Sequence, residues 1–173
     1  MLSMKQVAFN PLTCRFCTLI RTWFYYTFEY TKSENNMATQ IFVNLSVSDL
    51  NKSVEFFTKL GYTFNPQFTD EKATCMIISD TIYVMLLTRT FFQTFTEKEI
   101  IDAHKAIETS IAISADSKDA VNEMVDKAVA AGATIPNPAT DYGFMYQHSF
   151  DDLDGHHWEY VWMDPNGMPE HQG

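Results

Sequence analysis

The sequence predicts an α+β fold in which a β-α-β-β-β unit occurs twice. Two observations support this prediction. A stretch with period-two alternation of apolar residues is followed by one with apolar residues at helical spacing, and the same succession returns later in the chain. Two copies of roughly 65 residues account for residues 37–173, which we expect to form a single domain. The first copy spans about 40–88 and the second about 108–165.

The first copy begins with a strand over residues 40–47, where one face is solidly apolar and the other is mixed. Ser48 and Asp49 are suitable N-cap residues for a helix over 50–60, which carries an apolar stripe. Gly61 ends this helix. Three short strands complete the copy, and they are predicted over 62–68, 73–79 and 82–88.

The second copy repeats this order. Residues 108–114 alternate as a strand does, Asp116 and Ser117 cap a longer helix, and Gly132 ends that helix. Further strands are predicted over 133–136, 143–150 and 156–163, with a loop over 138–142 and a hairpin turn over 151–155. On the last strand one face carries aromatic residues that we expect to pack beneath the helices: Trp158, Tyr160 and Trp162.

Residues 89–107 connect the two copies and resemble neither of them. Thr96 and Glu99 form a capping box, which predicts a helix over 96–104. A flap over a cavity, a dimer contact and a connection that packs on the core all suit this segment. It carries three closely spaced aromatic residues: Phe91, Phe92 and Phe95.

The first 36 residues differ from the remainder in charge. They contain four basic and two acidic residues, so they carry +2, whereas the whole chain carries −10 and the remainder therefore −12. They show no period of 2 or 3.6 and no apolar run near the ~20 residues of a membrane-spanning helix. We interpret residues 1–36 as an appendage outside the fold or a misassigned start, and a partner-binding or targeting arm is the alternative. Cys14 and Cys17 form one C-x-x-C pair, which is weak evidence for a zinc or redox site.

The composition excludes several classes of protein. The 173 residues include 12 Lys and Arg against 22 Asp and Glu, and this acidic balance argues against binding to nucleic acid or to an anionic membrane surface. Three Cys are too few for a disulfide scaffold. We expect a cytoplasmic protein.

Two segments carry a recognisable pattern. Residues 42–62 include Phe-Val-Asn-Leu-Ser-Val-Ser-Asp-Leu and a later Leu-Gly-Tyr, and residues 154–159 read Asp-Gly-His-His-Trp-Glu. Together they resemble the glyoxalase / bleomycin-resistance / extradiol-dioxygenase superfamily, also called vicinal oxygen chelate proteins, and residues 160–165 look like its lactoylglutathione lyase-related subgroup. The resemblance spans residues 40–165. It implies a cupped, mostly antiparallel eight-stranded sheet with helices on the outer face, and a homodimer.

In that superfamily the inner face of the cup holds a divalent metal, and the ligands come from the first and fourth strands of each repeat. The resemblance places Phe42 at the first of these positions and Met85, or Leu86 with a shift of one residue, at the second. A phenyl ring cannot ligate a metal, and a thioether binds hard divalent ions poorly. Glu159 falls on the last-strand position, where a carboxylate is retained.

The remaining ligand position lies on the first strand of the second repeat and depends on the alignment. Aligning Asp116 with Asp49 selects Thr109, whereas aligning the apolar faces of the two strands selects Glu108. We prefer Glu108, because a slip of one residue would turn the isoleucines toward the cavity. Glu108 and Glu159 are therefore predicted to face inward together.

Histidines near this glutamate pair are candidates to complete a metal site. His157 precedes Glu159 by two residues and so shares its face of the strand, and His148 is in the neighbouring strand. A divalent metal (Zn, Ni, Mn or Fe) held by Glu159, Glu108 and His157, and a site without any cofactor, both fit this pattern. Without a metal, the two glutamates are candidates for an acid/base pair or a structural pair. The predicted pocket is further lined by Phe42, Asn44, Tyr83 and Met85.

Three functions follow from the resemblance. A small-molecule-binding protein of the bleomycin-resistance kind uses the cup without a metal, and the loss of ligands at Phe42 and Met85 favours this hypothesis. A divalent-metal-dependent lyase or isomerase of the lactoylglutathione lyase type is the alternative, which Glu159 and the histidines favour. An extradiol dioxygenase needs two His and one carboxylate around Fe(II), and it comes last because neither first-strand position offers His.

Overall fold

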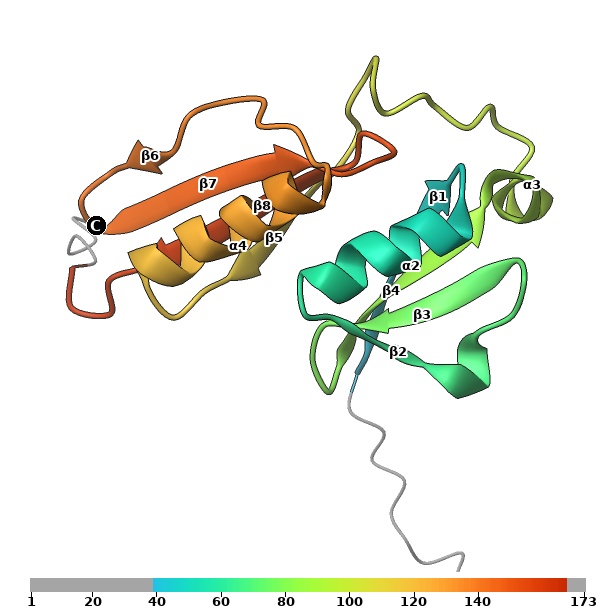
Figure 1. The fold of residues 1–173 in the computed structure, drawn as a ribbon, viewed down its shortest axis with the longest axis horizontal. Coiled ribbons are helices and arrows are strands. Elements are labelled where there is room, and N and C mark those ends of the chain that lie inside the picture. The colour runs from blue at the N-terminus through green and yellow to red at the C-terminus, as the bar shows by residue number, and fades with distance from the viewer. Residues whose placement is uncertain (1–38, 168–173) are drawn as a thin grey trace, which may run out of the picture. The chain divides into compact units, whose positions relative to one another are not determined.

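The computed structural model describes residues 39–167 of the chain (Figure 1). The predictions for residues 1–36, including the Cys14 and Cys17 pair, lie outside the described residues. Within residues 39–167, no helix is both long enough and apolar enough to cross a membrane.

The first repeat is a four-stranded sheet with one helix packed on it. Its elements are β1 (Ile41–Val47), α2 (Leu50–Lys59), β2 (Thr63–Asn65), the 3₁₀ helix η1 (Pro66–Phe68), β3 (Ala73–Ile77) and β4 (Ile82–Thr88). The strand order is β1-β4-β3-β2, in which β1 and β4 run parallel and the other neighbours run antiparallel. β2 is shorter than predicted because the chain turns into η1 at Pro66, whose ring fixes φ and removes a hydrogen-bond donor.

The second repeat has the same architecture. Its elements are β5 (Ser110–Ser114), α4 (Lys118–Ala131), β6 (Thr140–Asp141), β7 (Met145–Asp151) and β8 (His157–Met163). The strand order β5-β8-β7-β6, with β5 and β8 parallel, repeats that of the first sheet. The predicted duplication is therefore confirmed, and the eight strands are divided over two four-stranded mixed sheets.

Both helices begin and end where their capping residues predict. The Asp49 side chain accepts a hydrogen bond from the backbone nitrogen of Lys52 at 3.1 Å, and the Ser117 side chain accepts one from that of Ala120 at 3.0 Å. These bonds satisfy donors that the first helical turn leaves free. Gly132 ends α4 with a φ of 114°, a left-handed conformation that glycine adopts without steric cost.

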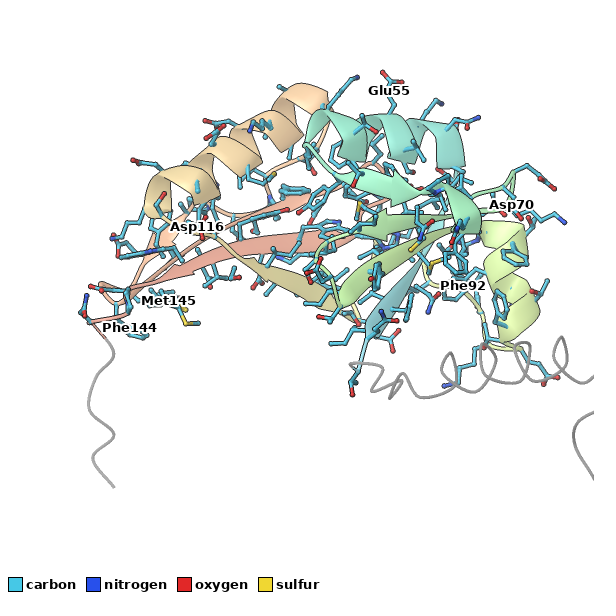
Figure 2. The ribbon with its side chains drawn as sticks, turned by 90° about the horizontal axis from the view of Figure 1, so that it is seen from below. Glu55, Asp70, Phe92, Asp116, Phe144 and Met145 are labelled. Atoms are coloured by element: carbon cyan, nitrogen blue, oxygen red, sulfur yellow. The ribbon has the colours of Figure 1, made fainter. Side chains whose placement is uncertain are left out.

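The two repeats share one apolar core. α2 and α4 lie on the same side of the two sheets (Figure 2), and side chains of both repeats pack together beneath them. The fully buried indole of Trp158 lies 5.2 Å from the Phe57 ring, measured between centroids, which joins the second sheet to α2. The hydroxyls of Tyr62 and Tyr160 also form a hydrogen bond between the repeats, and burial raises the pKa of both phenols. Trp162 packs against this core, so the predicted packing of the aromatic face of β8 is confirmed.

The connecting segment differs from its prediction. Its helical parts are α3 (Arg89–Phe92) and η2 (Gln93–Phe95), whereas residues 96–104, predicted as a helix, contain bends and a turn. The labelled Phe92 shows the position of α3 beside the first sheet in Figure 2. The prediction of a helix over 96–104 was therefore wrong.

Side chains of the preceding turns explain this difference. The Arg89 guanidinium donates hydrogen bonds to the carbonyls of Ile100 and Ile101. The Gln93 side-chain amide donates to the carbonyl of Thr96 at 2.7 Å. Carbonyl groups that a helix would use are therefore already bonded to side chains, and the irregular path is stabilised instead.

One strand prediction in the second repeat is displaced. Residues 133–136 contain a single bridge, between Thr134 and Asp151, rather than a strand. Regular pairing begins only at β6, inside the predicted loop. Pro136 and Pro138 explain the shift, because proline has no backbone N–H to donate to a strand ladder.

Candidate functional site

We call the face of each sheet that points away from α2 and α4 the inner face. In the first sheet, Phe42 pairs with Tyr83 and Asn44 pairs with Met85 across β1 and β4. Val84, between Tyr83 and Met85, is buried in the core beneath the helices, so strand alternation places all four pairing residues on the inner face. The Phe42 and Tyr83 rings are stacked, with centroids 5.0 Å apart.

In the second sheet, the pairs Ser110–His157 and Ala112–Glu159 lie on the inner face. Trp158, between the two inward residues of β8, is buried in the core on the other side. The imidazole of His157 and the carboxylate of Glu159 therefore share one face of β8, as strand alternation predicts.

Glu108 does not occupy the position predicted for it. Met85 and Glu159 are the corresponding positions of the two repeats. Phe42 pairs with Tyr83, two residues before Met85, and Ser110 pairs with His157, two residues before Glu159. Ser110 is therefore the counterpart of Phe42. Glu108 is exposed and lies before the start of β5. The alignment of the apolar faces selected a residue two places too early in the chain. A shift of two residues keeps the same side chains facing inward, so alternation alone could not detect it.

The helix caps carry the signal for the correct register. Ser117 is the N-cap of α4 and Asp49 is the N-cap of α2. The same number of residues separates Ser110 from the Ser117 cap and Phe42 from the Asp49 cap. Pairing Asp116 with Asp49 missed this register, because aspartate and serine are equally suitable caps in sequence.

His148 also differs from its prediction. It pairs with Tyr160 across β7 and β8, and Tyr160 is buried in the core, so the His148 side chain belongs to the helix-facing side. Its Nδ1 atom is buried and has no hydrogen-bond partner among the described residues. The residue of β7 that faces Glu159 is Ser149. Knowing that a residue is in the neighbouring strand does not tell which face of the sheet its side chain is on, because the pairing register determines the face.

A cavity of about 830 Å³ is lined by residues of β1, β4, the connecting segment and the start of β8. Asn44, Met85 and His157 line it, whereas Phe42 and Tyr83 do not. Most of the remaining lining is apolar and comes from the connecting segment: Phe91, Phe92, Phe95, Ile100, Ile101 and Ile107. Its volume is that of a typical site for a small molecule, roughly 300–1,000 Å³.

A smaller cavity of about 330 Å³ lies over the second sheet. Its lining is polar and includes Glu159, Ser149, Gln147 and His157, and it also borders on His148. Glu108 lines the larger cavity and Glu159 the smaller one, so the two glutamates predicted to face each other border different spaces. His157 lines both cavities.

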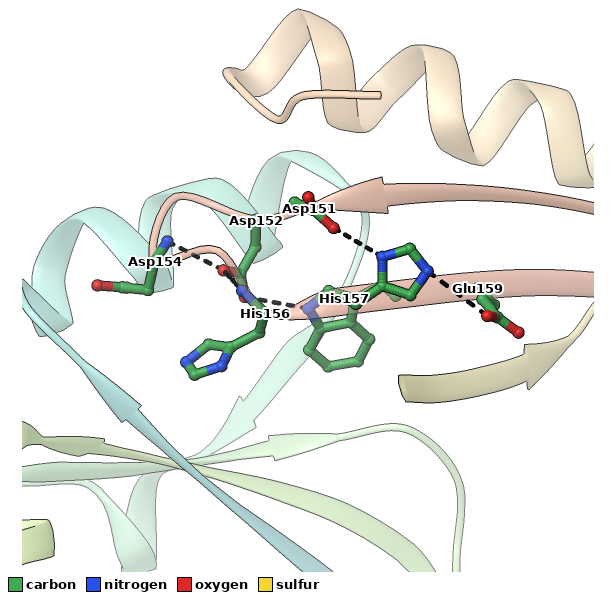
Figure 3. Close-up of polar contacts among 7 residues, drawn as sticks. Asp151, Asp152, Asp154, His156, His157 and Glu159 are labelled. Carbon is green, nitrogen blue, oxygen red and sulfur yellow. Dashed lines mark hydrogen bonds and ion pairs between the residues drawn. The ribbon is translucent and has the colours of Figure 1, made fainter. Parts of the chain in front are cut away.

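His157 lies between two carboxylates (Figure 3). Its Nδ1 atom is 2.7 Å from Oδ1 of Asp151, its partner across the β7–β8 ladder, and its Nε2 atom is 3.5 Å from Oε1 of Glu159. The His157 side chain is 14% exposed and both carboxylates are 30% exposed. Sequence reasoning missed Asp151, because it belonged to a predicted turn; its position opposite His157 follows only once the hairpin register is known.

The hairpin turn before β8 is organised by a buried carboxylate. Asp152 accepts hydrogen bonds from the Trp158 indole at 3.0 Å and from the backbone nitrogens of Asp154 and His156 at 2.9 and 3.0 Å. Burial raises the pKa of the Asp152 carboxyl, although the nearby His156 opposes this shift. These bonds fix the start of β8 and with it the position of His157.

The same hairpin joins the second repeat to the first. The Asp154 carboxylate accepts a hydrogen bond from the backbone nitrogen of Ser48 at 2.8 Å, and the His156 ring donates one to the carbonyl of Ser46 at 2.9 Å. Ser46 is on β1, so these bonds hold the start of β8 beside the strand that lines the larger cavity.

The inner-face residues do not fit the metal that the fold implies. The four positions that correspond to metal ligands hold a phenyl ring (Phe42), a thioether (Met85), a hydroxyl (Ser110) and a carboxylate (Glu159), of which only the last is a strong ligand for a hard divalent ion. Among residues 39–167, no group of three or more His, Cys, Asp or Glu side chains is arranged to hold a metal ion. The predicted set of Glu159, Glu108 and His157 is therefore not brought together.

Known proteins share this architecture. Residues 39–79 match the family model described as bleomycin resistance protein-like N-terminal. The hypothetical protein SA1046 from S. aureus is 26% identical, with a TM-score of 0.63 over 80% of this chain and 98% of that chain. A glyoxalase/bleomycin resistance protein/dioxygenase from Nocardioides is 21% identical, with a TM-score of 0.59 over 86% and 98% of the two chains. A glyoxalase/bleomycin resistance protein/dioxygenase family enzyme from Burkholderia phytofirmans PsJN is 17% identical, with a TM-score of 0.61 over 73% and 99%.

No curated protein matches the sequence significantly. The likeness to solved structures extends over both repeats, whereas the family model matches the first repeat alone. The subgroup related to lactoylglutathione lyase stays a prediction. The duplicated βαβββ architecture and the structural neighbours together show that the chain has the fold of the glyoxalase / bleomycin-resistance / dioxygenase proteins, and its first repeat matches the bleomycin resistance protein-like model.

Proposed function

We propose that this protein binds a small molecule in the larger cavity, as bleomycin-resistance proteins do, without a metal at the inner-face positions. The observation that carries this proposal is the cavity of about 830 Å³, whose walls are largely aromatic and aliphatic. Removing an apolar ligand surface from water contributes roughly 25 cal/mol per Å². A molecule with an aromatic or aliphatic body therefore suits this space.

The polar groups of the same cavity provide specificity. Asn44 contributes from the inner face, Lys98, Glu99 and Glu108 from the connecting segment, and His157 from the start of β8. A few polar groups in an apolar cavity fix the orientation of a ligand, because each buried ligand group must find a hydrogen-bond partner there. This combination favours a ligand that has both an apolar body and a polar or cationic group.

A metal-dependent lyase is supported less well. Its one supporting observation is that Glu159 and His157 remain next to each other on the inner face. Firm binding of a divalent ion needs further protein ligands, which Phe42, Met85 and Ser110 do not supply. An extradiol dioxygenase meets the same obstacle, since it needs a second histidine at these positions.

We also propose that two copies of the chain associate. β1 is an edge strand of its sheet and pairs only with β4 among the described residues. Ile41 is 54% exposed and Phe42 is 49% exposed at this edge. An apolar edge strand favours pairing with another chain unless something covers it.

The proposed cavity is tested by filling it. Ala106 lines the larger cavity, and Ala106→Trp should occupy part of it and weaken binding of the uncharged dye Nile red at least tenfold. Ala130→Trp is the matched control, because Ala130 is exposed on α4 and lines neither cavity. Fluorescence titration of the wild-type protein and both variants measures the effect. Equal dye binding in all three proteins would contradict the proposed function.

A further inference from the structure

The irregular part of the connecting segment consists of two halves that are held in different ways. The first half, residues 96–101, is tied to the helical turns that precede it. The Arg89 guanidinium donates hydrogen bonds to the carbonyls of Ile100 and Ile101. The Gln93 side-chain amide donates to two further carbonyls of this half. These bonds fix residues 96–101 beside α3 and η2.

The second half, residues 102–107, makes its hydrogen bonds only within itself, and we call it the Asp102 turn. The Asp102 carbonyl accepts hydrogen bonds from the backbone nitrogens of Lys105 and Ala106 at 2.9 and 3.2 Å. The Asp102 carboxylate accepts one from the backbone nitrogen of His104 at 3.2 Å and pairs with the Lys105 ammonium at 2.9 Å. Among the residues that the structure describes, no hydrogen bond or ion pair joins the Asp102 turn to a strand, a helix or the β7–β8 hairpin.

The Asp102 turn rests on the hairpin before β8. In Figure 1 the chain leaves α3, passes this hairpin and enters β5. A Cβ atom at Gly155 in the hairpin would lie 2.7 Å from the His104 nitrogen and 2.8 Å from the carbonyl carbon of Ala103. Ala103, Ala106 and Gly155 all line the larger cavity. At this point the cavity is therefore closed by packing alone.

Opening this contact costs little free energy. The Asp102 turn keeps its own hydrogen bonds when it moves as a unit, and lifting it breaks no hydrogen bond to either sheet. Ile101, just before the turn, and Ile107, at its end, are 48% and 64% exposed although both line the cavity, so little buried apolar surface is lost. Segments with few buried apolar contacts open locally at free energies well below that of global unfolding.

We propose that the Asp102 turn is a lid and that a ligand enters the larger cavity between this turn and Gly155. Because Arg89 holds the first half of the segment in place, the turn swings away from the hairpin about its two ends, near Ile101 and Ile107. An apolar ligand that reaches Ile107 covers this exposed side chain and so favours the closed position. This inference rests on the proposed function, because a lid has a role only if the larger cavity binds a ligand.

Gly155→Ala tests the lid, because the added methyl group pushes the Asp102 turn away from the hairpin. The probe is Nile red, mixed in a stopped-flow instrument with an excess of the full chain. Association and dissociation of the dye should both become about fivefold faster, and the affinity should stay within about twofold, since a lid that closes less firmly opens more often for entry and for exit. Gly143→Ala is the matched control: Gly143 also has a positive φ, but nothing lies within 4 Å of a Cβ there.

Arg89→Gln tests the place of entry. This substitution releases the first half of the segment from α3 and leaves the contact at Gly155 intact. The rates of dye entry and exit should therefore rise less than in Gly155→Ala. A larger rise in Arg89→Gln would put the entrance beside α3 and overturn the assignment to the Asp102 turn.

A measurement on the wild-type protein needs no substitution and so does not depend on the folding of Gly155→Ala. In ¹⁵N relaxation dispersion the amides of residues 103–107 should share one exchange rate, because the Asp102 turn moves as a unit, and saturating Nile red should suppress this exchange. The amides of residues 97–101 should show no such exchange, since Arg89 and Gln93 hold that half. Exchange confined to residues 97–101 would contradict the lid.

The outcomes separate the lid from the proposed function. If Nile red does not bind the wild-type protein, the proposed function fails, and the lid fails with it. If the dye binds at the same rates in the wild-type protein and in Gly155→Ala, the proposed function stands and the lid is wrong. If Gly143→Ala speeds entry as much as Gly155→Ala, the contact with His104 is not the cause, and the lid is again wrong.

Discussion

At the residue scale, one buried carboxylate fixes the start of β8. Asp152 accepts three hydrogen bonds, one from a side chain and two from the backbone, and it is almost completely buried. Removing one partner of a buried hydrogen bond costs about 1–3 kcal/mol, because the other partner is left without water or protein to bond. The stability of the hairpin therefore depends on the Asp152 side chain, although most turn residues contribute little to stability.

Asp152→Asn should lower the free energy of unfolding by about 2 kcal/mol, since the amide cannot accept from the Trp158 indole and both backbone nitrogens at once. Urea unfolding followed by tryptophan fluorescence measures the change. Asp126→Asn, at an exposed position of α4, is the control and should stay within about 0.5 kcal/mol of wild type.

The same substitution tests the raised pKa of Asp152. Burial raises this pKa in the folded protein above the ~3.9 of the unfolded chain. Between those two values the unfolded chain has released a proton that the folded protein keeps, so the free energy of unfolding falls as the pH rises. The contribution is fully present below pH ~4 and is lost as the pH rises through the folded pKa. The stability difference between wild type and Asp152→Asn should therefore narrow as the pH is raised from about 4; a difference that widens would contradict the raised pKa.

At the scale of single elements, contacts at two points fix the path of the connecting segment. Arg89 bonds to Ile100 and Ile101 near its beginning. Farther along, the backbone of His104 packs against Gly155 in the hairpin before β8, where a Cβ atom would lie 2.7 Å from the His104 nitrogen. A side chain at residue 155 would therefore collide with the segment that lines the larger cavity.

Gly155→Ala should separate the segment from the hairpin. Gly143→Ala is a close control, because both glycines have a positive φ, 86° and 84°, but nothing lies within 4 Å of a Cβ at Gly143. We expect Gly155→Ala to cost at least about 1 kcal/mol more than the control. Hydrogen exchange of residues 96–107 should also become faster in Gly155→Ala. Equal stability of the two variants would show that the contact with His104 does not constrain the segment.

Local sequence patterns predicted most elements well, for a physical reason. The strands and helices that form the core bury a regular set of apolar side chains, so alternation and helical spacing revealed β1, α2, β5 and α4. The connecting segment has no such set. Its path depends on bonds from Arg89 and Gln93 to distant carbonyls, which overrode the capping box at Thr96.

The candidate site was predicted only in part, because its details depend on strand register. Alternation correctly put His157 and Glu159 on one face, but it could not detect a shift of two residues at Glu108. It also gave no face for His148, whose direction depends on how β7 pairs with β8. Asp151 was missed for the same reason, since a cross-strand partner is not adjacent in sequence.

At the scale of the whole molecule, the duplication explains both the shared core and the different inner faces. The two helix-facing sides are apolar in both repeats and merge into one core. The inner faces have diverged: the first carries a stacked Phe42–Tyr83 pair, and the second carries Asp151, His157 and Glu159. One repeat therefore offers apolar surface, and the other offers charge.

The proposed dimer is tested at the exposed edge of the first sheet. Ile41→Lys should shift the chain toward monomer in sedimentation velocity, because a charge at an apolar edge opposes strand-to-strand association. Val129→Lys changes an exposed apolar residue on α4 in the same way and serves as the control. A wild-type protein that sediments as a monomer at all concentrations would refute the dimer.

The central claim is that the larger cavity holds the apolar body of a small molecule and that no metal takes part. The most direct measurement is a crystal structure of the full chain grown with 4-phenylbutylamine. The account predicts the phenyl ring in the larger cavity, between the connecting segment and β4. An empty cavity, or an ion bound by Glu159 with the amine elsewhere, would contradict it.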